Sequence, residues 1–151
     1  MSSDQTITVV GAGLGGLMLA CVLHRNGIGA AVLDLDASPT ARDQGGMLDM
    51  HEESGQAALR AAGLFDQFLG KVLPGGEATR IFDREATVRW EDGGGDATRP
   101  EVNRSALREM LLAALPDDTV RWDARVTGVR PLGDGRHEVT LAGAARSPPT
   151  C

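Results

Sequence analysis

The segment Gly11-Ala12-Gly13-Leu14-Gly15-Gly16 carries the clearest chemical signal in the chain. Its glycines have the spacing G-x-G-x-x-G, between a short β-branched run and an apolar helical pattern. Gly11 suits a tight turn, Gly13 lets the backbone approach a pyrophosphate, and Gly16 lets the helix pack closely on the strand. The helix would also present unpaired N–H groups and a positive dipole end to phosphates. The spacing therefore predicts a dinucleotide-binding site.

Asp34 strengthens this prediction, because it follows Gly16 by eighteen residues at the end of a second apolar run. A carboxylate at that place accepts hydrogen bonds from ribose hydroxyls, and its charge repels a 2′-phosphate, which disfavours NADP in this site. The alternative is a glycine-rich turn without a ligand. Because the glycines stand between a predicted strand and a predicted helix and are followed by Asp34, ligand binding is favoured over this alternative. The motif leaves NAD and FAD open.

Two strands and a helix must position these residues. The runs 6–10 and 30–33 predict buried strands, and apolar residues at helical spacing between them predict a helix that ends at Gly27. Such a βαβ unit implies a parallel pair of strands. The sequence predicts an α/β fold with a Rossmann-like parallel sheet and an adjacent antiparallel hairpin, in residues 1–141, followed by an irregular tail over 142–151.

The rest of the chain shows shorter elements. We expect a strand over 47–50, a helix from an N-cap at Ser54 to Ala62 with Gly63 as its stop, and a helical turn over 64–69. Asn103 is expected to cap a helix with one apolar stripe. Further strands are expected over 78–82, 87–90 and 120–122, and a hairpin over 126–132 and 137–141.

Composition excludes several classes of protein. The net charge is -6 and Lys71 is the only lysine, so the basic stripe of a nucleic-acid-binding protein is missing. Two cysteines, Cys21 and Cys151, give neither a disulfide framework nor a metal cluster, which favours a reduced, cytoplasmic setting. The apolar stretch 11–31 is broken by His24 and several glycines, so no transmembrane span or signal peptide is expected.

The chain resembles the group A flavoprotein monooxygenases, the para-hydroxybenzoate hydroxylase family, and within it most resembles the tetracycline-inactivating monooxygenases. The resemblance runs from about residue 5 to 141. Beyond the glycine motif, it rests on three segments: Arg42-Asp43-Gln44-Gly45-Gly46-Met47-Leu48-Asp49-Met50-His51, residues 54–64, and Pro100-Glu101-Val102-Asn103-Arg104-Ser105-Ala106-Leu107-Arg108. The Gly-Gly-x-Leu-Asp-x-His run and the Asn-Arg-x-x-Leu-Arg helix start are the more specific parts.

The resemblance implies roles by position. Asp34 matches the acid that binds the adenosine ribose of FAD, Asp49 a carboxylate in the flavin site, and Arg104 an FAD-contacting arginine. Arg42 matches a basic residue linked to NADPH docking, and Arg108 lies one helical turn from Arg104, where it can share its face. From the residues alone, both arginines of the helix could equally be solvated, Asp49 a turn carboxylate and Arg42 a loop charge. Many relatives place arginine directly after the ribose-binding acid, where this chain has Leu35.

By the same resemblance, the parent protein uses FAD, NAD(P)H and O2 to hydroxylate an electron-rich aromatic or polyketide-like molecule, with no side chain singled out as catalytic. We expect the chain to hold the ADP-binding portion, to lack the substrate domain, and to be inactive alone. Two alternatives stay open: a nucleotide-binding module without catalysis, complemented by a second polypeptide, and a fragment of an NAD-dependent oxidoreductase.

Overall fold

The computed structural model describes residues 7–42, 45–73, 78–93 and 98–143. The chain begins with strand β1 (Ile7–Val10), helix α1 (Leu14–Arg25) and strand β2 (Ala30–Leu33). β1 and β2 pair in parallel, with Ile7 opposite Ala30 and Val10 opposite Leu33. This confirms the predicted βαβ unit. Gly27, with φ at 70°, ends α1 as expected of a residue that must enter the left-handed region.

The parallel sheet has three strands in the order β1-β2-β7, where β7 is the short strand Val120–Arg121. β7 pairs in parallel with β2, with Val32 opposite Val120. The ladder continues past the named strands, since the Asp34 N–H donates to the Arg121 carbonyl at 3.0 Å and the Ala124 N–H donates to the Asp34 carbonyl at 2.7 Å. Asp34 is thus fixed to β7 through its backbone.

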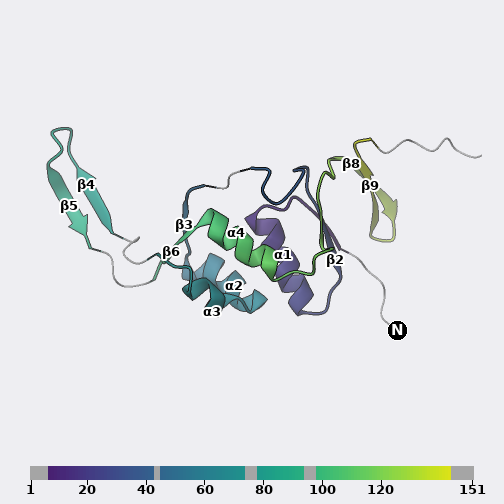
Figure 1. Cartoon of the computed structure of the whole chain (residues 1–151), viewed down its shortest axis with the longest axis horizontal. Helices are drawn as coiled ribbons and strands as arrows, with labels where there is room; N and C mark the ends of the chain where they lie inside the picture. The colour runs from purple at the N-terminus through teal and green to yellow at the C-terminus, as the bar shows by residue number, and fades with distance from the viewer. Residues whose placement is uncertain (1–6, 43–44, 74–77, 94–97, 144–151) are drawn as a thin grey trace, which may run out of the picture.

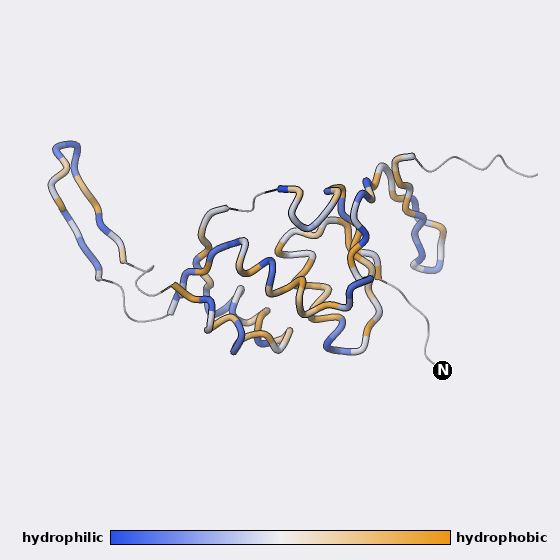
Figure 2. Tube along the Cα trace, viewed as in Figure 1, coloured by the Kyte–Doolittle hydropathy of each residue, from blue (hydrophilic) through white to orange (hydrophobic). Residues whose placement is uncertain are grey.

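A helical layer buries the core, with α1 against this sheet and the other helices packed on α1 and on one another (Figure 1). It consists of α1, a wide turn η1 (Glu52–Gln56), α2 (Ala57–Ala62), α3 (Phe65–Leu69) and α4 (Arg104–Ala113). Figure 2 shows apolar residues concentrated where these elements meet. Full burial of each large apolar side chain contributes about 1.5–3 kcal/mol to folding. The largest fully buried ones are Phe68, Leu17, Leu59, Leu111, Val32 and Val102.

The start of the second helical region differs from the expectation. Ser54 lies inside η1 rather than capping a helix, and α2 begins only at Ala57, without a side-chain cap. The reason is a tertiary contact: the buried Gln56 side chain donates to the carbonyls of Met50 at 2.7 Å and Thr98 at 3.1 Å, which holds this turn against the preceding strand. The stop at Gly63 is confirmed, with φ at 71°.

Helix α4 begins as expected. The Asn103 Oδ1 accepts from the N–H groups of Ser105 at 2.9 Å and Ala106 at 3.4 Å, which satisfies two N–H groups of its first turn. Asn103 also ends strand β6 (Glu101–Asn103), which pairs antiparallel with β3 (Met47–Asp49). The apolar stripe of α4 is buried, with Leu107, Met110 and Leu111 in the core, and Leu115, just after the helix, joins them.

Two antiparallel hairpins extend from opposite ends of this body (Figure 1). One pairs β4 (Thr79–Phe82) with β5 (Val88–Asp92), so its second strand runs two residues beyond the expected end. The other pairs β8 (Val126–Gly133) with β9 (Arg136–Leu141), as expected. None of the helices in the described ranges is long and apolar enough to cross a membrane.

Candidate dinucleotide-binding site

The glycine-rich loop joins β1 to α1 and has the geometry that its spacing predicts. Gly11 has φ at 103°, a conformation that side chains rarely adopt. A Cβ on Gly16 would lie 2.0 Å from the Gly11 carbonyl oxygen and 3.2 Å from Val9 Cγ1, so only glycine lets α1 approach the strand this closely. A Cβ on Gly13 would meet nothing within 4 Å. Gly13 therefore leaves open space where a ligand could approach.

The N-terminus of α1 is suited to an anion. Gly13 is its N-cap and offers no side-chain cap, and the first turn carries no acidic residue. The Leu17 N–H donates to the Gly13 carbonyl at 2.9 Å, so intrahelical bonding starts there and the earlier N–H groups remain available. These N–H groups and the helix dipole favour a phosphate at this end.

Asp34 lies directly beside this loop, as expected. Its side chain is 6% exposed, and its Oδ2 accepts from the Ala12 N–H at 2.5 Å while its Oδ1 accepts from the Asp36 N–H at 2.8 Å. The carboxylate therefore joins the end of β2 to the turn between Gly11 and Gly13. Each carboxylate oxygen has further lone pairs that can accept a ribose hydroxyl.

Arg42 follows on the loop after β2 and is paired with a second acid. Its Nε donates to Asp36 Oδ2 at 2.8 Å, with 62% of the Arg42 side chain and 7% of the Asp36 side chain exposed. Asp36 was not among the expected site residues. The signal was present, because Asp34 and Asp36 are two residues apart at the end of a strand and so share a face. Leu35, between them, is 57% exposed.

Asp49 ends strand β3 of the β3–β6 pair, and Arg104 is the first residue of α4, directly after β6. The Arg104 N–H donates to the Gly46 carbonyl at 3.0 Å, and Asp49 is exposed opposite Glu101 in the ladder. Among the described residues, no hydrogen bond or ion pair joins either side chain to Asp34. The structure thus places them on neighbouring elements, and their expected contacts with FAD stay predictions.

Arg108 is not a solvated helix residue, so that alternative is wrong for it. It is 5% exposed, its Nη1 donates to the Pro39 carbonyl at 2.5 Å, and its guanidinium lies over the Trp122 ring, with Cζ 5.4 Å from the centroid. Its Nε is buried without a hydrogen-bond partner. Arg108 therefore ties α4 to the loop after β2.

The described residues offer binding groups rather than reactive ones. Cys21 is buried in the core beneath α4, and burial raises the pKa of its thiol to about 11, so it is a packing residue. Within the described ranges, no three acids, histidines or cysteines are grouped as metal ligands would be. The arrangement can hold a phosphorylated nucleotide and orient it.

Comparison with known proteins identifies the nucleotide. The family model described as "FAD binding domain" matches residues 4–143. The chain belongs to this FAD-binding family. Its cofactor is FAD, and the open cradle at Gly13, the uncapped α1 N-terminus and Asp34 fit the ADP part of that group. The predicted family and fold class are confirmed.

Curated relatives of this FAD-binding chain are monooxygenases. It is 35% identical over 139 residues to the monooxygenase asqM of Emericella nidulans, and the matched region covers 89% of this chain and 31% of the relative. It is 30% identical over 133 residues to the monooxygenase penA of Penicillium thymicola, and the matched region covers 85% of this chain and 30% of the relative. The chain thus spans about a third of the length of these relatives.

Solved structures show the same fold. Tetracycline destructase Tet(51) matches with a TM-score of 0.66 and 22% identity, over 91% of this chain and 35% of the other. Klebsiella pneumoniae HpxO, solved with FAD and uric acid, matches with a TM-score of 0.74 and 21% identity, over 94% of this chain and 36% of the other.

Proposed function

We propose that this chain is the ADP-binding portion of a flavin-dependent monooxygenase that hydroxylates an electron-rich aromatic or polyketide-like small molecule. The observation that carries the proposal is Asp34, a buried carboxylate bonded to the glycine-rich loop at the uncapped end of α1. Bound FAD would supply the redox chemistry, with NAD(P)H as reductant and O2 as oxidant. The monooxygenase names of asqM and penA support the reaction type.

The chain's own residues would bind and orient the cofactor. Asp34 would accept the ribose hydroxyls of the adenosine, and the N–H groups of the α1 N-terminus would donate to the pyrophosphate. Arg104, near the glycine turn at Gly46, would contact FAD, and Asp49 would lie toward the flavin. Arg42, exposed on its loop, would receive NAD(P)H. We place the protein in the cytoplasm, in keeping with its two cysteines.

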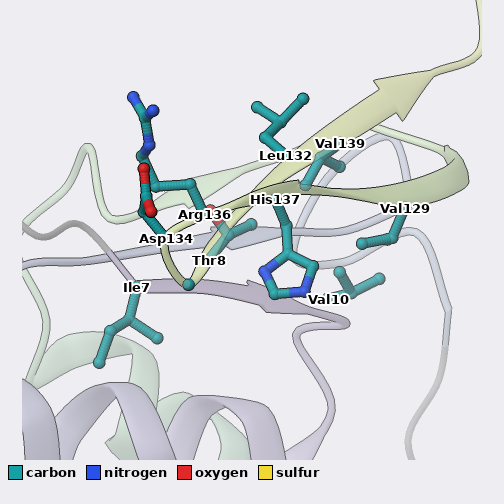
Figure 3. Close-up of a pocket in the computed structure, with 10 residues that line it drawn as sticks. Ile7, Thr8, Val10, Val129, Leu132, Asp134, Arg136, His137 and Val139 are labelled. Carbon is teal, nitrogen blue, oxygen red and sulfur yellow. The ribbon is translucent and has the colours of Figure 1, made fainter.

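The sheet itself supports completion of the site by further polypeptide. β1 pairs only with β2 in the described part of the chain, although the strand that carries a glycine motif is normally internal to a doubly wound sheet. A groove of about 1020 Å³ runs between β1 and the β8–β9 hairpin, with Val10, Val129 and Val139 among its lining residues (Figure 3). We propose that a parallel strand of a complementing segment fills it and carries the remaining flavin and substrate contacts.

A nucleotide-binding module without catalysis is the second candidate, favoured by the binding character of the described groups. Titration calorimetry with ADP, FAD and FMN tests nucleotide binding, which both candidate functions require. The proposed function predicts that ADP and FAD both bind and that FMN binds much more weakly, because the cradle at Gly13 and Asp34 recognises the ADP end. Binding of none of these would refute the site. Consumption of NADPH by the FAD-loaded chain, together with its complementing segment, separates an enzyme from a module.

A further inference from the structure

A second cavity lies between the loop after β2 and helix α4. It has a volume of about 310 Å³, and its lining includes Thr40 and Arg42 from the loop and Ser105, Arg108 and Glu109 from the helix. Neither Asp34 nor any residue of the glycine-rich loop lines it. The cavity is therefore separate from the cradle proposed for the ADP part of FAD.

Arg108 brings an unbalanced positive charge to this cavity. Its side chain is more than nine-tenths buried, its Nη1 is committed to the Pro39 carbonyl, and its Nε has no partner. In the part of the chain that the structure describes, no carboxylate oxygen lies within 4.0 Å of it. A buried charge without a counterion is unfavourable, and the Trp122 ring compensates it only in part. An anion in the cavity would supply the missing charge.

The remaining polar groups indicate what kind of anion fits. Thr40 and Ser105 bring hydroxyls, which can donate, and Arg42 keeps N–H groups beyond the Nε that it gives to Asp36. Donors from two elements around a buried arginine suit a tetrahedral oxyanion, whereas a carboxylate has only two oxygens to offer them. The N–H groups of Ser105 and Ala106 are already bonded to Asn103, so recognition rests on side chains.

We propose that this cavity binds a phosphate group, either free or as the monoester of a small molecule. Its volume equals that of about ten waters at roughly 30 Å³ each, which accommodates a phosphate and a sugar attached to it. Glu109, exposed on the same helix, lies on the lining and would oppose the anion. This site is additional to the proposed FAD site and does not depend on it, and it shares Arg42 with the NAD(P)H contact proposed above.

Calorimetric titration of the full chain at low ionic strength, with inorganic phosphate and with ribose 5-phosphate, tests the proposal. Tighter binding of ribose 5-phosphate identifies an organic monoester, and equal binding identifies free phosphate; either supports the site. Binding of neither anion overturns it. In both supporting cases sulfate should compete with phosphate for the cavity, because the two anions have the same tetrahedral shape.

Variants locate the binding. Ser105→Ala removes a hydroxyl from the lining and should weaken phosphate binding by about threefold to tenfold, while FAD titration is unchanged. Arg108→Lys keeps the charge but loses the planar fork, and we expect a loss of at least about tenfold. Glu109→Gln is the matched change of opposite sign and should strengthen binding by about twofold. Because Ser105 and Glu109 are not core residues, these variants keep the test informative if Arg108→Lys fails to fold. Phosphate affinity that is unaffected by both Ser105→Ala and Glu109→Gln would overturn the assignment.

Discussion

The glycine motif allows a structural role to be separated from a ligand role by three alanine substitutions. A Cβ at Gly16 would lie 2.0 Å from the Gly11 carbonyl oxygen, and real Cβ contacts are essentially never under 3.0 Å. The carbonyl or the helix must therefore move by at least 1.0 Å (3.0 − 2.0). That carbonyl belongs to a residue whose N–H donates to Leu33 at 2.7 Å, so the shift disturbs the strand pairing. Overpacking of this kind costs about 1–3 kcal/mol.

Gly15→Ala is the matched control. Its Cβ would meet nothing within 4 Å, and alanine is favoured over glycine in a helix by up to about 1 kcal/mol. Because Gly16 also lies in α1, this gain is common to both variants, and their free energies of unfolding should differ by the overpacking cost alone, about 1–3 kcal/mol. For a chain of 151 residues this corresponds to roughly 2–12 °C in the midpoint of thermal unfolding, followed by far-UV circular dichroism.

Gly13→Ala completes the set, because its Cβ also meets nothing in the protein and its φ of -72° suits alanine. We expect it to lower the unfolding midpoint only slightly, because alanine is a poorer N-cap than glycine, and to weaken ADP binding strongly. If Gly16→Ala unfolds at the same temperature as Gly15→Ala, the close helix–strand approach is not what requires glycine. If Gly13→Ala binds ADP normally, the open space at Gly13 is not the pyrophosphate site.

Three further outcomes are expected. Asp34→Ala leaves two backbone N–H groups without an acceptor and should lower the free energy of unfolding in urea by about 1–3 kcal/mol for each, besides weakening ADP binding; equal stability would contradict the hydrogen bonds. Asn103→Ala removes the cap of α4 and should cost about 1 kcal/mol in the same assay, a loss that Asn103→Asp should largely avoid. In a Cys151→Ser background, Cys21 should resist thiol reagents at pH 8 until the protein unfolds, and rapid labelling of the folded chain would refute its burial. Because folding raises its pKa from 9.0 to about 11, its contribution to stability is present below pH 9 and lost as the pH rises through 11.

Local patterns predicted most of the fold. The βαβ unit, the Gly27 and Gly63 stops and the Asn103 cap each depend on a few neighbouring residues, so their sequence signals were sufficient. Ser54 failed as a helix cap because Gln56 bonds to Thr98, 42 residues away along the chain. A pattern of nearby residues contains no information about such a contact.

The site, like the fold, could be predicted from the sequence only in part. The position of Asp34 beside the glycine-rich loop follows from the spacing of one motif. The burial of Arg108 does not, because it depends on Pro39, which is 69 residues away, and on the ring of Trp122. Arg104 and Arg108 are four residues apart on the same helix, and the sequence gives no sign of which of the two is buried. Only the packing of α4 against the loop after β2 decides that.

The two hydrogen bonds that the Asp34 carboxylate accepts have a consequence for the redesign of nucleotide preference. A natural way to accept a 2′-phosphorylated nucleotide is to replace the ribose-binding acid by a neutral or basic residue. Here the same carboxylate holds the Ala12 and Asp36 N–H groups, so removing it also loosens the turn that cradles the pyrophosphate. Selectivity and structural integrity are therefore coupled at one side chain. A change of preference would require a second substitution that supplies new acceptors for those two N–H groups.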